Sequence, residues 1–153
     1  FKFAVDTGGL FNGSEYAAAK VAGHELKGLM AFFQLKMREF ALPLMALVDY
    51  RGFRLIALSV LPLSGKSLIY GTNDAGRTVV ASNKYFNELM RQAGTRLNAP
   101  PHLCGLDPTK TVTLHSAADV EGHLGTDGRY YVLDFSRTLP PVQPVREVLN
   151  GHL

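Results

Sequence analysis

The sequence predicts an α+β fold, in which one long and one shorter amphipathic helix pack on a mostly antiparallel sheet. Hydrophobic residues make up 46% of the 153 positions and the formal charge is only +3, a balance typical of a folded chain. Two stretches repeat apolar residues at helical spacing, and several short apolar runs are separated by turn residues. A chain of this length can bury one core, so we expect residues 1–153 to form a single domain.

The long helix is expected over residues 12–40, where apolar side chains recur at steps of three and four. Asn12 or Ser14 can cap its start, because each is followed by backbone N–H groups that lack partners within the helix. Gly23 and Gly28 lie inside this stretch and weaken it relative to alanine. They predict either a kink or a close contact with another helix.

Short apolar runs bounded by turn residues predict the strands and the second helix. Residues 44–49 and 53–61 are expected to form a β-hairpin, with Gly52 in the turn free to adopt a positive φ. Ser82 or Asn83 begins the shorter helix, which ends near residues 94–98. Other elements are expected at residues 1–5, 67–70, 78–81, 111–115 and 130–135 as strands, at 122–128 as a turn region, and at 145–149 as a helical turn.

Several classes of protein are excluded by composition and spacing. Cys104 is the only cysteine, so no disulfide framework can form and a reducing compartment is expected. The apolar stretch 42–48 is far shorter than the roughly 20 residues that cross a bilayer, so no membrane insertion is expected. The histidines and Cys104 lack the paired spacing of a structural metal site, and we predict neither a metal nor a cofactor. The start at Phe1 suggests a domain cut from a longer protein.

Residues 119–137 raise an enzymatic alternative. Asp119 is followed by a polar turn and then by an apolar strand that ends in Asp134-Phe135. In kinase-type phosphotransferases a catalytic aspartate precedes a metal-binding Asp-Phe pair in a similar order. A remote kinase-like lobe, active or degenerate, would use Asp119 and Asp134 for proton acceptance and magnesium. The competing interpretation is a hairpin in which Asp134 caps the strand end or pairs with an arginine.

Binding residues are expected at the turns, where acidic, aromatic and basic side chains gather. If the fold brings Tyr50, Arg51, Arg77 and Arg129 to one face, they form a modest site for phosphates. The competing interpretation is that arginines at turn edges are simply solvated. The candidate binding residues, all expected at the surface, are Asp49, Tyr50, Arg51, Tyr70, Arg77, Gly122, Asp127 and Arg129.

Four stretches then carry a family resemblance in a fixed order between residues 44 and 141. They are residues 48–54, residues 68–71 leading to 76–79, residues 122–134, and residues 137–141. With these, the sequence resembles the Clu (clustered mitochondria) domain family. The first 40 residues match this pattern less clearly, and Phe135 stands where leucine is common in the family.

The resemblance implies a cytoplasmic protein that acts in mitochondrial distribution and biogenesis. It also implies association with protein partners, with ribosomes and with messenger RNAs for mitochondrial proteins. It carries over no catalytic residue. The resulting hypothesis is a non-enzymatic interaction module, with the kinase-like phosphotransferase as the alternative.

Overall fold

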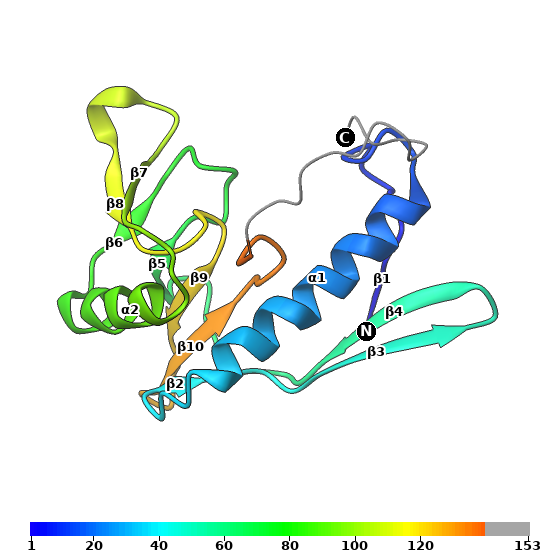
Figure 1. The fold of residues 1–153 in the computed structure, drawn as a ribbon, viewed down its shortest axis with the longest axis horizontal. Helices are drawn as coiled ribbons and strands as arrows, with labels where there is room; N and C mark the ends of the chain where they lie inside the picture. The colour runs from blue at the N-terminus through cyan, green and yellow to red at the C-terminus, as the bar shows by residue number, and fades with distance from the viewer. Residues whose placement is uncertain (140–153) are drawn as a thin grey trace.

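The computed structural model describes residues 1–139 and confirms the α+β class (Figure 1). Two α-helices are present among these residues, together with short strands and one 3₁₀ turn. The elements are β1 (Lys2–Phe3), α1 (Glu15–Gln34), β2 (Phe40–Ala41), β3 (Met45–Tyr50), β4 (Phe53–Leu58), β5 (Leu68–Gly71), β6 (Val80–Ala81), α2 (Lys84–Arg96), β7 (His102–Cys104), a 3₁₀ turn (Pro108–Lys110), β8 (Val112–Leu114), β9 (Glu121–Leu124) and β10 (Tyr130–Leu133). The helical turn predicted at 145–149 lies outside the described residues.

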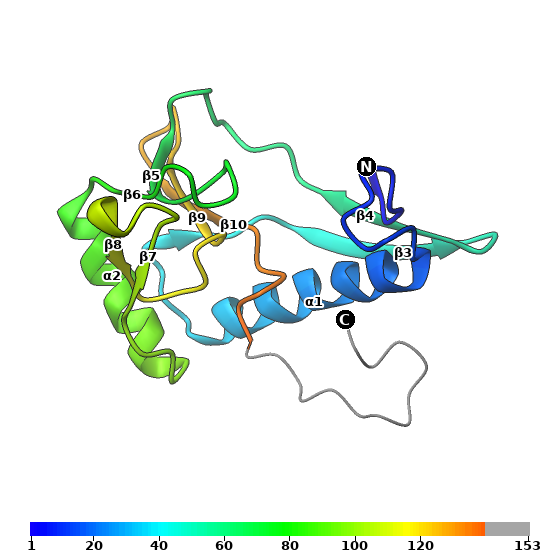
Figure 2. The ribbon, with the colours of Figure 1, turned by 90° about the horizontal axis from the view of Figure 1, so that it is seen from above.

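The strands form three sheets. A five-stranded sheet has the order β2-β10-β9-β5-β6, and only its β2–β10 pair is parallel. A three-stranded antiparallel sheet has the order β1-β4-β3, and β7 pairs with β8 in a third. Figures 1 and 2 show that the β3–β4 hairpin extends away from the five-stranded sheet and that α1 runs alongside both. Neither helix has the length and apolar character needed to cross a membrane.

Helix α1 is shorter than predicted at both ends. Ser14 is its N-cap, and the Ser14 hydroxyl accepts a hydrogen bond of 3.2 Å from the Ala17 N–H. Asn12 adopts a φ of 52°, which lies outside the helical region. Lys36 takes the same left-handed φ and redirects the chain after the helix. The predicted end at Phe40 is therefore wrong, because Phe40 belongs to β2 and pairs with Tyr130.

The core lies between the five-stranded sheet, α2 and the C-terminal half of α1. The Phe32 ring packs against Phe40 and Phe135, and the Phe86 ring packs against Phe40 and Tyr70, with ring centroids 5.3 to 6.1 Å apart. Gly28 of α1 faces the backbone of Phe135, where an added Cβ would overlap the carbonyl oxygen. The close contact predicted for this glycine therefore exists, although its partner is the chain after β10 and not another helix.

The hairpin and the second helix agree with their predictions. Arg51 and Gly52 adopt φ values of 49° and 84°, so the two-residue turn has positive φ at both positions. Asn83 caps α2, and its side chain accepts a hydrogen bond from the Phe86 N–H. The strands β7 and β9 were not predicted. Strand β9 occupies the start of the expected 122–128 turn region, and the turn itself is confined to the residues between β9 and β10.

Candidate functional site

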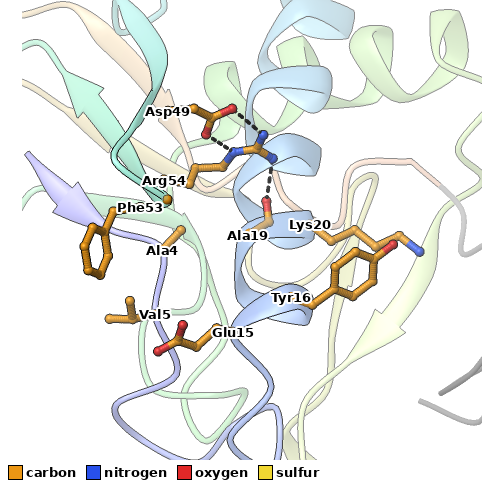
Figure 3. Close-up of a pocket in the computed structure, with 10 residues that line it drawn as sticks. Ala4, Val5, Glu15, Tyr16, Ala19, Lys20, Asp49, Phe53 and Arg54 are labelled. Carbon is orange, nitrogen blue, oxygen red and sulfur yellow. Dashed lines mark hydrogen bonds and ion pairs between the residues drawn. The ribbon is translucent and has the colours of Figure 1, made fainter.

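A cleft of about 450 Å³ is lined by the turn end of the hairpin, by the residues that follow β1, and by the N-terminal half of α1 (Figure 3). Asp49 and Arg54 are cross-strand neighbours, and the guanidinium donates two hydrogen bonds of 2.7 Å to the carboxylate. A third guanidinium N–H donates to the carbonyl oxygen of Ala19 in α1 at 3.2 Å. The hydrogen bond from Arg54 lowers the pKa of Asp49. Arg54 therefore links the hairpin to α1, and Asp49 holds the Arg54 guanidinium in place, which gives the candidate binding residue Asp49 a structural role.

A second cavity of about 350 Å³ adjoins this cleft, and Ala4 and Val5 line both. Its walls are mostly apolar and come from β1, β4, α1 and the loop before α1. The charged residues that line it are Lys2, Glu25, Asp119, Asp134 and Arg137. The two aspartates of the phosphotransferase alternative thus line one cavity, although they come from different loops.

The carboxylates of this second cavity have different environments. The Asp119 carboxylate is paired with the Arg137 guanidinium. Glu25 accepts a hydrogen bond of 2.8 Å from the Phe135 N–H, and burial raises its pKa. Asp134 has a φ of 56° and forms no ion pair within residues 1–139. The surrounding protein atoms, and then the charges of Glu121 and Glu25, raise the pKa of Asp134 to about 6.

These environments limit the chemistry of the second cavity. A carboxyl with a pKa near 6 can accept a proton close to neutral pH, as a general base must. Among residues 1–139, however, no three His, Cys, Asp or Glu side chains are placed to hold a metal ion. Asp119 and Asp134 therefore line the same cavity, but no third His, Cys, Asp or Glu among residues 1–139 is placed to complete a metal site with them.

A third region, which we call the basic corner, combines cations with two tyrosines. It lies where the end of α1, β2, α2 and the β9–β10 turn meet. Two adjoining hollows of about 260 and 520 Å³ share Arg38 and Glu39. The residues of the basic corner are Lys36, Arg38, Tyr85, Arg96, Arg129 and Tyr130. Glu39 is the only acidic residue in the lining of the two hollows.

Backbone pairing builds the basic corner. The parallel β2–β10 pair places Phe40 opposite Tyr130. Arg38 and Arg129 each lie just before one of these paired residues, so the pairing brings the two arginines to the same end of the sheet. The Tyr85 and Tyr130 rings lie 5.6 Å apart at an angle of 44°. Arg96 donates a hydrogen bond of 3.1 Å to the carbonyl oxygen of Leu35, which fixes α2 against the end of α1. Lys36 and Arg38 are exposed and form no ion pair within residues 1–139.

The fold does not gather the arginines that the sequence nominated. Tyr50 and Arg51 lie at the hairpin turn, at the far right of Figure 1, where the guanidinium stacks 5.5 Å from the tyrosine ring. Arg77 follows Gly76, whose carbonyl oxygen accepts a hydrogen bond from Leu106 just after β7. Arg129 lies in the β9–β10 turn beside β2, at the lower left of Figure 1. Of these residues, only Arg129 belongs to the basic corner.

Two nominated residues are not at the surface, so the expectation for them is wrong. The Tyr70 side chain is 1% exposed, and its hydroxyl accepts a hydrogen bond of 2.7 Å from the His115 N–H. Gly122 is buried beneath Phe86, where a side chain would overlap the aromatic ring. Asp127 is exposed and accepts hydrogen bonds from the Tyr131 hydroxyl and the Arg129 N–H, as a turn aspartate does.

Sequence reasoning missed Lys36, Arg38, Tyr85 and Tyr130 as site residues. Lys36 and Arg38 were assigned to the long helix, where cations at this spacing are an ordinary solvated face. The sequence feature that could have indicated them is the position of Lys36 and Arg38, two cations close together between the last apolar turn of the helix and Pro43. The pairing of β2 with β10, which joins residues ninety positions apart, has no local signature.

The histidines are dispersed, and one of them is part of a buried chain of hydrogen bonds. His123 Nδ1 lies 2.9 Å from the Ser67 hydroxyl, and Nε2 lies 2.9 Å from the Glu121 carboxylate. Ser67 and His123 are both buried, and the Ser67 hydroxyl donates to the carbonyl oxygen of Ser64. The three side chains connect β9 to the start of β5, so they stabilise the sheet.

Comparison with known proteins agrees with the resemblance. The family model described as "Clustered mitochondria" matches residues 1–143, a longer part of the chain than the 44–141 quoted above. The chain is 35% identical over 134 residues to "Protein clueless" of Drosophila persimilis, and 36% identical over 136 residues to the "Clustered mitochondria protein homolog" of Brugia malayi. Each match covers 84% of this chain but only 9% of the relative. No solved structure matches the chain.

Proposed function

Because the chain belongs to the clustered-mitochondria family, we propose that it is a non-enzymatic interaction module of a cytoplasmic protein that acts in mitochondrial distribution and biogenesis. We further propose that it contacts the RNA of messengers or ribosomes through the basic corner. The family match and the names of the relatives support the first part. The chain spans about a tenth of the length of these relatives. The role in mitochondrial distribution, which concerns a whole protein of this family, is therefore part of the proposal.

The basic corner is the observation that supports RNA contact. Four cations and a single carboxylate line its two hollows. Arginine guanidinium groups form paired hydrogen bonds with phosphate oxygens, and Arg38 and Arg129 are both exposed. The Arg129 guanidinium lies 3.9 Å from the Asp127 carboxylate, a long contact that a phosphate would replace. Tyr85, which is exposed and packs on the half-buried Tyr130 ring, supplies an aromatic face in the same lining, and bases of single-stranded nucleic acid stack on such faces without regard to sequence. The arrangement fits a phosphate backbone with one or two unstacked bases.

A binding titration tests this proposal. A fluorescent single-stranded RNA of mixed sequence is titrated with the chain at several salt concentrations. We expect affinity to fall steeply with salt, because each phosphate that pairs with an arginine releases counterions. The double variant Arg38→Glu/Arg129→Glu should bind at least about tenfold more weakly and should show a shallower salt dependence.

The matched control is Arg77→Glu/Arg51→Glu, which makes the same change of charge at two exposed arginines outside the basic corner. It should weaken binding only slightly, through the net charge. Equal losses in the two double variants would contradict a localised site. Binding that does not depend on salt would contradict phosphate contact altogether.

The shared cavity of Asp119 and Asp134 favours a second candidate, the kinase-like phosphotransferase. In this candidate Asp119 would accept a proton and Asp134 would hold magnesium, and Lys2 in the same lining would pair with a phosphate oxygen. This candidate predicts that ATP with magnesium raises the melting temperature of the chain, since a ligand that binds only the folded state stabilises it. Asp134→Asn should abolish that rise. An unchanged melting temperature with ATP and magnesium leaves the interaction module as the function.

A further inference from the structure

The β1-β4-β3 sheet has one face that is turned toward α1 and one that is turned away from it. Arg54 reaches α1, and Lys2, Ile56 and Leu58 line the second cavity together with α1 residues, so these side chains define the covered side. The alternation of side chains along a strand places their neighbours on the opposite side. We call this opposite side the outer face. Its residues are Phe3, Ala46, Val48, Tyr50, Phe53, Leu55 and Ala57.

The outer face is open along its aromatic half. Tyr50 is 62% exposed, Phe3 56%, Phe53 53% and Val48 41%. The Phe3 and Phe53 rings pack edge to face with centroids 6.2 Å apart, and Tyr50 lies opposite Phe53 in the register. These side chains therefore form one continuous patch rather than scattered exposed residues.

An antiparallel sheet with one face in water normally alternates apolar and polar residues along each strand. Residues 45–48 and 55–58 do not alternate, because all eight are apolar. None of the seven outer-face residues carries a charge. Such a pattern is typical of a sheet that is covered on both sides, so the outer face needs a partner in addition to α1.

We propose that the outer face packs against the outer face of a second copy of this chain, forming a two-fold symmetric sandwich of two three-stranded sheets. A two-fold interface brings the same patch of each copy together, so the patch must be complementary to itself. A patch with charges of one sign would repel its own copy. Among residues 1–139, the only cation stacked on the outer face is Arg51, which lies on the Tyr50 ring at the turn end. The Phe3, Val48 and Phe53 part of the face carries no charge. The basic corner lies at the opposite end of the molecule from the hairpin turn and stays free in this arrangement (Figure 1).

The size of the patch sets the expected strength. An aromatic side chain presents about 200 Å², so the exposed fractions of the three rings leave about 340 Å² of aromatic surface open. With the aliphatic members of the outer face, each copy contributes about 500 Å², and the pair would bury about 1,000 Å². Interfaces of this size are at the lower limit of specific association. We therefore expect a reversible dimer that forms with rising concentration, and not a permanent one.

Sedimentation equilibrium of the unmodified chain over a wide concentration range tests the proposal. The mass should rise from 16.7 kDa toward twice that value, and added sulfate should strengthen the association, because excluded salts favour apolar burial. The variant Val48→Lys should weaken dimerisation at least about tenfold by placing like charges opposite each other. Leu103→Lys, an equally charged change at an exposed leucine of β7, should leave the association unchanged.

A cross-linking experiment identifies the face independently of any effect of lysine on folding. Cysteine introduced by Ala46→Cys should form an intermolecular disulfide under mild oxidation, because Ala46 is exposed on the outer face. Cysteine introduced by Leu103→Cys should not, and the native Cys104 is buried. A chain that stays monomeric at the highest concentrations overturns the proposal, and so does a dimer that both lysine variants disrupt equally. Burial of the outer face only within a longer polypeptide would give the monomeric result.

Discussion

The two sheets that α1 touches are stabilised in different ways. The five-stranded sheet and α2 enclose fully buried aromatic rings, among them Phe86 and Phe135. Within β3 and β4, by contrast, no residue is fully buried. The hairpin is held instead by its own turn and by polar contacts, chiefly those of Arg54 with Asp49 and with the Ala19 carbonyl oxygen.

This difference separates the part that defines the fold from a part that can respond to partners. Burial of apolar surface is the largest favourable term in folding, so the five-stranded sheet should set the global stability. Segments with few buried contacts open locally at low free energy. The hairpin should therefore be the more mobile of the two regions, unless its outer face is covered.

The largest effect is expected from truncation in the five-stranded sheet. Phe86 is fully buried, and its ring contacts Phe40, Tyr70 and Tyr130. Phe86→Ala removes these contacts and leaves a cavity, at a cost of about 3–5 kcal/mol in the free energy of unfolding. Phe53→Ala, the matched change on the outer face, should cost less than about 1 kcal/mol because the ring is already half exposed. Urea denaturation measures both, and similar losses would contradict the comparison.

A smaller effect, with opposite signs at two positions, is expected from glycines in α1. In an exposed helix, Gly→Ala normally stabilises by up to about 1 kcal/mol. Gly23→Ala should do so, because the nearest neighbour of an added Cβ is an Arg54 nitrogen 4.0 Å away. Gly28→Ala should instead destabilise by about 2 kcal/mol, since the methyl group would overlap the Phe135 backbone. Stabilisation by both substitutions in thermal unfolding would show that α1 does not pack closely on this segment.

Asp134 provides a pH-dependent test at the boundary between the two regions. Its pKa is raised from 3.8 to about 6 in the folded chain, so the folded state binds a proton more tightly than the unfolded state. The stability that this carboxyl contributes is therefore fully present below about pH 4 and is lost as the pH rises through about 6. Asp134→Asn keeps a residue that tolerates positive φ and removes the charge.

We expect Asp134→Asn to stabilise the chain by about 1 kcal/mol at pH 7.5 and to have little effect at pH 4, after allowance for solvent around this partly exposed group. The pKa of Glu25 is also raised, chiefly by burial, so the stability that its carboxyl contributes is likewise lost as the pH rises. Unfolding titrations at the two pH values measure the difference. A destabilising effect at pH 7.5 would mean that the Asp134 carboxylate has a favourable partner.

Local sequence signals predicted the elements that depend on local chemistry. The hairpin was predictable because Gly52 marks a turn between two apolar runs, and α2 was predictable from Asn83 and the spacing of its buried face. The end of α1 was not, because Phe40 continues the helical spacing although it pairs with Tyr130 in the sheet. Strand β9 was hidden by Gly122, a glycine that leaves room for the Phe86 ring rather than forming a turn.

The candidate sites show the same limit. Asp119 and Asp134 could be named because they lie in one stretch of sequence with a recognisable order. The basic corner combines residues from four segments between positions 36 and 130, and only the fold brings them together. Tyr70 and Gly122 were named as surface residues because tyrosine and glycine occur in turns, but both fill positions that the core requires.

Replacing Arg54 should have the smallest effect on global stability. Its effect on hydrogen exchange should be confined to the hairpin. Arg54→Ala removes the guanidinium that joins β3, β4 and α1, and leaves the Ala19 carbonyl oxygen without this donor. Hydrogen exchange of residues 45–58 should accelerate about tenfold while the melting temperature changes little, because local opening does not require the core to unfold. Arg51→Ala is the control. The Arg51 guanidinium stacks on the adjacent Tyr50 ring and does not link the hairpin to α1, so this variant should leave exchange unchanged.

If Arg54→Ala also accelerated exchange in β9 and β10 to the same extent, the hairpin and the five-stranded sheet would unfold as one unit, and the distinction between them would not hold. Exchange confined to the hairpin would instead mean that its outer face can be covered or released without disturbing the rest of the fold.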